Sequence, residues 1–227
     1  MQTSFINKVL LMNVNVLISR FFNNSEPYIE VFDSKNIYSV YVELQEKLRD
    51  IADIELSVLQ ALAYCFYEVM DNVLVHSGKS NGMVLLEYLP KQKRIKILIA
   101  DDGIGIKASL SENKQFSDIT EEKALYSCVE DKVSSGNGMG FGLYSTARLV
   151  KDAGTKLIIQ SGEHTLCCEG AEMHVEKSDL WQGTLVYLEL ISDKEINPDA
   201  VVDNRTNVIG QYNETFLDKK DRFDELW

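Results

Sequence analysis

The chain has 227 residues, of which 45% are hydrophobic and 26% are charged. This length and composition suffice for one full hydrophobic core, with room for an appended segment. The formal net charge of −12 argues against an electrostatic nucleic-acid binder or a polybasic membrane surface, and neither Lys nor Arg forms a run. Because an acidic surface repels phosphates, a bound nucleotide would need a cation and local N–H donors.

The four cysteines indicate a reducing compartment. Cys65, Cys128 and the vicinal pair Cys167 and Cys168 show no C-x-x-C spacing, which makes a poor disulfide or zinc framework. The apolar stretch over residues 9–18 is too short to span a bilayer, and it lacks the basic region and cleavage site of an export signal. We therefore expect a cytoplasmic protein that binds neither membrane nor nucleic acid.

The first quarter of the chain predicts helices around one strand. Residues 1–25 have apolar positions that fit neither period cleanly, and we favour a helix. Residues 28–32 alternate as a short strand, and a helix follows over about 37–51. A long apolar helix then starts near residue 54 and ends near Ser77.

The middle of the chain predicts a hairpin and a helix. Strand-like runs over residues 83–89 and 94–100 are separated by Pro90 and three polar residues, so we expect adjacent strands. A polar segment over residues 107–117 follows. A helix over residues 119–131 comes next, opened by an N-capping pattern.

The remainder predicts one helix and two strands. The helix covers residues 144–153 and is closed by a glycine. Strands are expected over residues 156–161 and 183–191, with a loop between them that holds the vicinal cysteines and His174. From Ser192 onward the chain is polar and acidic, which leaves open a linker, a docking segment or the start of a further domain.

A polar stripe on the long apolar helix is the first candidate site. Glu68, Asn72 and His76 stand at i, i+4 and i+8 and share one face of a helix. The surrounding residues are apolar, so an unpaired carboxylate and amide there would each cost about 1–3 kcal/mol. The stripe must therefore face a cavity, a ligand or dedicated partners. The alternative is an ordinary surface helix, on which polar residues at this spacing are common.

Asp101 ends an apolar strand and is followed by Gly103 and Gly105. The glycines permit left-handed backbone and close approach of a flat ligand, and a strand-end carboxylate can accept a hydrogen bond from an exocyclic amine. Such a charge-assisted bond contributes about 1.5–3 kcal/mol, enough to select adenine over guanine. D-x-G-x-G also occurs in plain turns and calcium loops.

Four alternating glycines precede the helix that begins near Tyr144. They are Gly136, Gly138, Gly140 and Gly142. Their bare N–H groups beside a helix N-terminus suit phosphate oxygens, and the same ribbon can serve as a lid or a hinge. The pattern matches neither a P-loop nor a dinucleotide-binding fingerprint.

Taken in order, these motifs resemble one family. The series Glu68-x-x-x-Asn72-x-x-x-His76, Asp101-x-Gly103-x-Gly105, Gly138-x-Gly140-x-Gly142-Leu143 and Gly183-Thr184 is similar to the ATP-binding domain of gyrase, heat-shock chaperone ATPases, histidine kinases and MutL, the GHKL superfamily with the Bergerat fold. The resemblance runs from about residue 30 to residue 192. It implies a two-layer α/β sandwich, with a mixed, largely antiparallel sheet and helices on one face.

The resemblance divides the chain into three parts. Residues 28–192 form the ATP-binding domain, residues 1–27 an N-terminal extension, and residues 193–227 an acidic C-terminal tail or linker. A protein partner is implied, and a homodimer is left open.

The resemblance also assigns roles to residues. Asn72 matches the asparagine that binds Mg²⁺, and Glu68 matches the catalytic carboxylate that activates water in the hydrolysing branches of the family. Asp101 accepts from the adenine amine, directly and through a water shared with Thr184. The remaining nucleotide-binding candidates are Gly103, Gly105, Ile106, Gly138, Gly140, Gly142 and Leu143. His76 is either a feature shared with anti-sigma-factor serine kinases or a structural helix-end residue.

Three departures narrow the function. None of the three histidines has the acceptor context of a histidine kinase, so autophosphorylation is not expected. Gyrase and MutL carry a second domain that supplies a lysine to the γ-phosphate, and we expect none here. The segment over residues 107–133 is longer than the lid of the anti-sigma kinases.

Three functions share this pocket. The first is a regulatory protein kinase or switch, similar to an anti-sigma serine kinase. The second is an ATPase coupled to dimerisation or to a partner, with water as the acceptor. The third is a non-catalytic ATP sensor. Phosphoryl transfer depends mainly on positioning and charge neutralisation, so the pocket sequence does not specify the acceptor.

Overall fold

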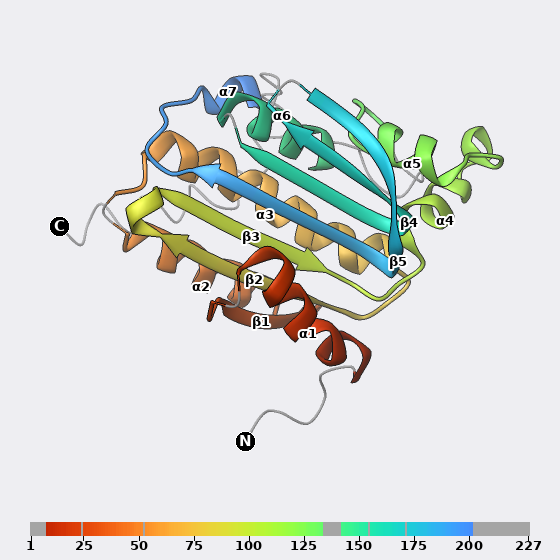
Figure 1. Ribbon diagram of the computed structural model, residues 1–227, viewed down its shortest axis with the longest axis horizontal. Helices are drawn as coiled ribbons and strands as arrows, with labels where there is room; N and C mark the ends of the chain where they lie inside the picture. Colours follow the sequence, from red (N-terminus) through yellow and green to blue (C-terminus); the bar gives the residue numbers. More distant parts are fainter. Residues whose placement is uncertain are drawn as a thin grey trace.

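The computed structural model describes residues 8–23, 25–51, 53–133, 142–153, 155–170 and 172–201. Its centre is a five-stranded sheet in the order β1-β2-β3-β5-β4, seen face-on in Figure 1. The strands are β1 (Tyr28–Asp33), β2 (Asn81–Leu89), β3 (Arg94–Ala100), β4 (Lys156–Glu169) and β5 (Glu172–Ile191). The predicted α/β sandwich is confirmed. Every neighbouring pair of these described strands is antiparallel, so the sheet contains no parallel pairing in the part of the chain that the structure describes.

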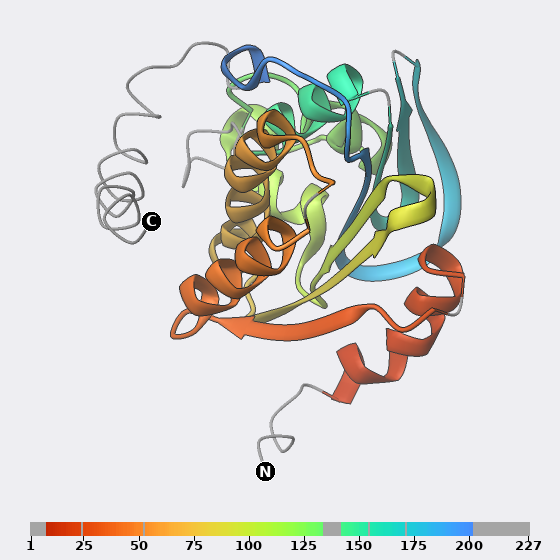
Figure 2. The same cartoon turned by 90° about the vertical axis from the view of Figure 1, so that its left-hand side faces the viewer.

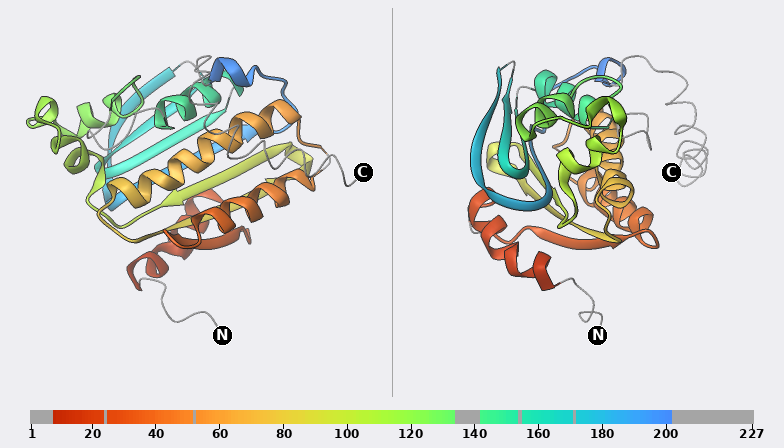
Figure 3. Two further views of the ribbon diagram at one scale, coloured as in Figure 1. Left: turned by 180° about the vertical axis from the view of Figure 1, so that it is seen from behind. Right: turned by 90° about the vertical axis from the view of Figure 1, so that its right-hand side faces the viewer.

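A layer of helices covers one face of the sheet (Figures 2 and 3). It is built from α2 (Ile37–Arg49), α3 (Leu56–His76) and α6 (Gly142–Ala153), with the short α4 (Gly105–Ser111) and α5 (Glu121–Ser127) beside β4. The predicted β2–β3 hairpin is confirmed, with a single 3-10 turn at Pro90–Gln92 between its strands. The main core lies between this layer and the sheet.

The central helix α3 forms because its sequence is apolar around most of its circumference. Leu62, Phe66 and Met70 are at most 1% exposed and fill the space between α3 and the sheet. Burial of each such side chain contributes about 1.5–3 kcal/mol. By length and composition α3 is the one helix of the described chain that could cross a membrane, but its apolar side chains are packed into this core.

The helix α1 (Lys8–Phe21) lies on the opposite face of the sheet (Figures 1 and 2). Its residues Leu17 and Phe21, with the following Phe22, form a second core against β2, β3 and β5. The ring of Phe21 lies 4.7 Å from that of Tyr187, centre to centre. The helix expected over residues 1–25 is therefore present within the described part, and it adds a helix to the face that we expected to be bare.

The segment between the last two predicted strands is a hairpin and not the loop that the sequence predicted. β4 and β5 continue as paired strands to Glu169 and Glu172. Two shifts of register, between Ser161 and Gly162 and between Gly162 and His164, interrupt the pairing. These bulges interrupt the alternation of polar and apolar residues on which a strand prediction depends. In the half of β5 next to the hairpin turn most side chains are also exposed to solvent, so that half carries no apolar pattern.

Two further segments differ from the expectation. The polar segment expected over residues 107–117 begins inside α4, a helix that starts at Gly105 and buries Ile106 and Leu110. After β5 the chain stays on the domain: the N–H of Ile196 donates to the hydroxyl of Ser57 at 3.1 Å, and the short α7 (Pro198–Val201) buries Val201 completely. The expected tail therefore begins with residues that belong to the core.

Candidate functional site

The polar stripe of α3 faces the N-terminus of α6. Glu68 and Asn72 are half-buried, and Gly142 is the first residue of α6. A Cβ atom at Gly142 would stand 3.0 Å from the Asn72 amide nitrogen and 3.0 Å from the Glu68 Cβ. Only a glycine fits here without displacing a neighbour. The N-terminus of α6 thus lies beside a carboxylate and an amide, an arrangement suited to phosphate and a hard cation.

The C-terminal end of α3 contacts the Asp101 loop, residues 101–105. The N–H of Ile104 donates to the carbonyl of Ser77, the residue that caps α3, at 2.8 Å. A side chain at Gly103 would overlap the backbone of Ser77. Burial lowers the pKa of His76, which precedes Ser77, whereas the nearby Asp71 carboxylate acts to raise it. Glu68, Asn72 and the Asp101 loop are thereby aligned along one helix.

Asp101 is 2% exposed and is fixed by the backbone of two segments. Its Oδ1 accepts from the N–H of Gly103 at 2.7 Å and from the N–H of Thr184 at 3.3 Å. The N–H of Asp101 in turn donates to the carbonyl of Thr184 at 2.9 Å. Burial raises the pKa of Asp101 to about 6, against the two backbone N–H donors. A buried carboxyl with a perturbed pKa at a strand end is typical of a functional site.

Glycines allow these segments to approach. Gly183 has φ +96°, and a side chain there would collide with the carbonyl of Asp101 and the N–H of Gly103. Gly105 has φ +78°, and a Cβ there would stand 2.6 Å from the hydroxyl of Ser161. Both positions combine a left-handed backbone with a close contact, so they need glycine for two separate reasons.

Three residues that support the Asp101 loop were missed by the sequence reasoning. Ser161 accepts from the N–H of Ile106 at 2.9 Å and donates to the carbonyl of Gly183 at 2.9 Å. Trp181 donates from its indole nitrogen to the carbonyl of Asp101 at 3.1 Å, and Gln182 donates to the carbonyl of Gly103 at 2.7 Å. Trp181 and Gln182 directly precede Gly183, in a segment that was expected to be a loop, and Ser161 is the last residue of the strand expected over residues 156–161.

The other predicted nucleotide-binding residues fall in three places. Leu143 follows Gly142 in α6 and packs against the main core. Ile106 is 8% exposed, and its side chain belongs to that core, so only its backbone reaches the loop. Gly138 and Gly140 lie outside the described residues.

An open pocket of about 300 Å³ adjoins the site. It lies between α4, α5 and β4, and Gly105 and Ser161 are shared between its lining and the supports of the Asp101 loop. Glu68, Asn72 and Asp101 do not line it as the structure describes the chain. The candidate site is defined by the side chains and backbone that meet along α3, and this pocket adjoins it.

The comparison with protein families gives one match over the part of the chain that carries this geometry. The model of the histidine kinase-, DNA gyrase B- and HSP90-like ATPase family matches residues 58–190, from the first turn of α3 to the end of β5. The chain belongs to this family. A comparison with curated proteins finds no significant match. The family match confirms the resemblance to the GHKL superfamily and establishes the chain as an ATP-binding domain of the GHKL type.

Proposed function

We propose that this GHKL domain binds ATP with Mg²⁺ and transfers the γ-phosphoryl group to a serine of a protein partner, as a regulatory kinase of the anti-sigma type. The observation that carries the proposal is the meeting of Glu68, Asn72 and the N-terminus of α6 at Gly142.

The residues present suit a magnesium ion. Asn72 is half-buried beside the carboxylate-bearing Glu68, and an amide oxygen is a neutral hard ligand that Mg²⁺ accepts together with phosphate oxygens. Mg²⁺, when bound, would neutralise the charge of the phosphates, which the net charge of −12 otherwise repels. The α6 N-terminus adds N–H donors on the side of Gly142.

The adenine end is assigned to the Asp101 loop. Oδ1 of Asp101 is already held by the backbone of Gly103 and Thr184. We propose that the other carboxylate oxygen accepts from the adenine amine, and that the Thr184 hydroxyl shares a water with it. Gly103 and Gly105 would let the base approach the backbone.

Glu68 is proposed as the general base. Its carboxylate takes the proton of the serine hydroxyl while the serine oxygen bonds to the γ-phosphorus, and the bond from that phosphorus to the bridging oxygen breaks to release ADP. Gly142 keeps the approach to Glu68 open, since any larger residue there would press on its Cβ. The products are ADP and a phosphoserine on the partner.

Self-phosphorylation on histidine is not part of the proposal. His76 is the last residue of α3, and His164 and His174 lie in β4 and β5. The ring of His164 is held against Glu121 at 2.9 Å. In a histidine kinase the acceptor stands on a separate helical hairpin, and no histidine of this sequence is in that context.

The test uses the full chain, Mg²⁺ and ATP labelled at the γ-phosphate. Small proteins encoded beside the gene are added as acceptors, and labelled phosphoserine and free phosphate are both quantified. Label on an acceptor, lost by at least about 100-fold in Glu68→Gln, is the expected result for removal of a general base. Asp71→Asn, one turn along α3, is the matched control and should retain the rate.

The alternatives give different outcomes in the same assay. Phosphate release without an acceptor, abolished by Glu68→Gln, would replace the kinase with an ATPase. Binding of Mg²⁺ and ATP with no transfer and no hydrolysis would indicate a sensor. Full turnover in Glu68→Gln would contradict the role of Glu68 in either reaction.

A further inference from the structure

The outer half of the β4–β5 hairpin brings together three side chains that the nucleotide site does not use. Cys167 of β4 stands directly opposite His174 of β5, and Glu176 is two residues further along β5. Alternation along a strand puts His174 and Glu176 on the same face, and the cross-strand pairing adds Cys167. One sulfur, one nitrogen and one oxygen of these residues all lie within 4.8 Å of one another.

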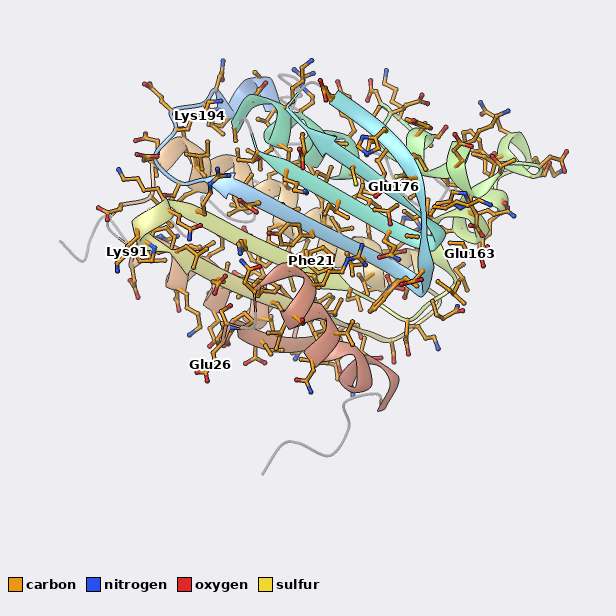
Figure 4. The ribbon with its side chains drawn as sticks, viewed as in Figure 1. Phe21, Glu26, Lys91, Glu163, Glu176 and Lys194 are labelled. Carbon is orange, nitrogen blue, oxygen red and sulfur yellow. The ribbon has the colours of Figure 1, made fainter. Side chains whose placement is uncertain are left out.

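This cluster lies on the face of the sheet opposite to α5 and α6. The neighbouring Cys168 is 6% exposed and belongs to the core under the helix layer, so the vicinal cysteines point to opposite faces. Cys167 is half-buried, whereas His174 and Glu176 are exposed. Figure 4 labels Glu176 on the upper part of the hairpin, away from α1 and the labelled Phe21. The cluster is therefore open to solvent.

We propose that Cys167, His174 and Glu176 bind a zinc ion. A thiolate, an imidazole and a carboxylate are the three side-chain types that bind Zn²⁺ in proteins, and a water would complete a tetrahedron. Sulfur and nitrogen donors favour zinc over Mg²⁺ and Ca²⁺, which take oxygen ligands. The site is thus chemically distinct from the proposed magnesium site at Asn72.

Zinc binding requires the three ligand atoms to move closer together than in the structure, where they lie within 4.8 Å of one another. Zinc bonds of 2.0–2.3 Å in a tetrahedron place the ligand atoms about 3.3–3.7 Å apart. The exposed side chains of His174 and Glu176 can reach these separations by rotation about their side-chain bonds, since no core packing holds them. Cys167 stays in place on β4.

The ion would connect the two strands two residues before their last pair, Glu169 with Glu172. Cys167 and His174 are cross-strand neighbours, and zinc would link their side chains directly. The inner half of the same hairpin carries Ser161 and Thr184, which contact the Asp101 loop region. A metal that binds only the paired hairpin stabilises the folded state, and this stabilisation grows with the logarithm of the free metal concentration above Kd.

The experiment is a titration of the full, reduced chain with Co²⁺ in the absence of nucleotide. We expect one equivalent to bind with a thiolate-to-cobalt charge-transfer band, and Zn²⁺ to displace it and raise the melting temperature. Cys167→Ser should abolish the band. His174→Ala should weaken Zn²⁺ binding by about tenfold or more, because even the removal of an outer-shell partner costs 10–100-fold in affinity.

Matched controls use the same residue types on the opposite face of the same strand. Cys168→Ala and His164→Gln should both retain the cobalt band and the zinc affinity. A band that survives in Cys167→Ser, or the absence of any thiolate band in the wild-type chain, would overturn the proposal. Far-ultraviolet circular dichroism of each variant establishes that the chain is folded, and His164→Gln alone suffices as the control if Cys168→Ala does not fold. Nucleotide binding plays no part in the readout.

Discussion

Asp101→Asn should lower the affinity for ATP and raise the stability of the unliganded domain. The carboxyl is 2% exposed, and burial raises its pKa from 3.8 to about 6. The asparagine oxygen can replace Oδ1 as the acceptor from Gly103 and Thr184, so the loop keeps its backbone contacts. The amide then presents N–H donors where the adenine amine requires an acceptor.

The substitution has opposite effects on ATP affinity and on the stability of the unliganded domain. Loss of a charge-assisted hydrogen bond of about 1.5–3 kcal/mol weakens ATP binding by about 10- to 150-fold. A pKa raised by about two units means that the ionised carboxyl costs the folded state about 3 kcal/mol above pH 6. Because the folded pKa lies above the unfolded one, this cost is absent below pH 3.8 and complete above pH 6. The gain in stability should therefore appear at pH 7 to 8 and vanish in acid.

The assay combines calorimetry of Mg²⁺-ATP binding with urea unfolding of the unliganded chain at pH 4 and pH 8. Asp102→Asn is the matched control, since Asp102 is the adjacent buried carboxylate and the resemblance assigns it no contact with adenine. It should bind ATP as the wild type does. Equal ATP affinity in Asp101→Asn would remove Asp101 from the adenine site, and a loss of stability at pH 8 would refute the burial argument.

Two further predictions concern the fold around the site. Gly183→Ala should lower the free energy of unfolding in urea by more than about 3 kcal/mol, because Gly183 has φ +96° and an added Cβ would collide with the Asp101 backbone. Gly170→Ala should cost only about 1–2 kcal/mol, because Gly170 has φ +59° but no atom within 4 Å of the added Cβ. Equal losses in the two variants would contradict this reasoning. Glu121→Gln should lower stability by about 0.5–1 kcal/mol at pH 6, because it removes the charge that faces His164 at 2.9 Å. The hydrogen bond from His164 lowers the pKa of Glu121, so this difference should be present above pH 4.5 and shrink as the pH falls below it in thermal melts; a constant difference down to pH 3 would contradict it.

The sequence predicted the elements whose residues have one unambiguous environment. α3 is apolar on nearly every side, and β2 and β3 are short apolar runs around Pro90, so composition alone placed them. The order of the motifs placed Glu68, Asn72, Asp101 and Thr184 in one candidate site, and the structure brings Asp101 to Thr184 and Gly142 to the other two. The binding roles of these residues stay predictions.

The sequence did not predict the hairpin or the contacts that it makes. The bulge at Gly162 shifts the register, so the polar and apolar positions of β4 do not alternate through it. Because residues 162–182 were expected to form a loop, there was no reason to place Trp181 and Gln182 beside the Asp101 loop. The pairing of Cys167 with His174 depends on the same register, and cysteine spacing along the chain carries no information about a partner on another strand.

The packing of α3 explains how a polar site is held in an apolar layer. Phe66 and Met70 are buried in the core between the helix and the sheet, each two residues before a member of the polar stripe, Glu68 and Asn72. A helix with 3.6 residues per turn cannot rotate to follow a ligand without moving these side chains out of a close-packed core. Glu68 and Asn72 are therefore fixed in relation to the Asp101 loop, which is bonded to Ser77 at the end of the same helix. Nucleotide-dependent movement in this domain is consequently not expected in α3.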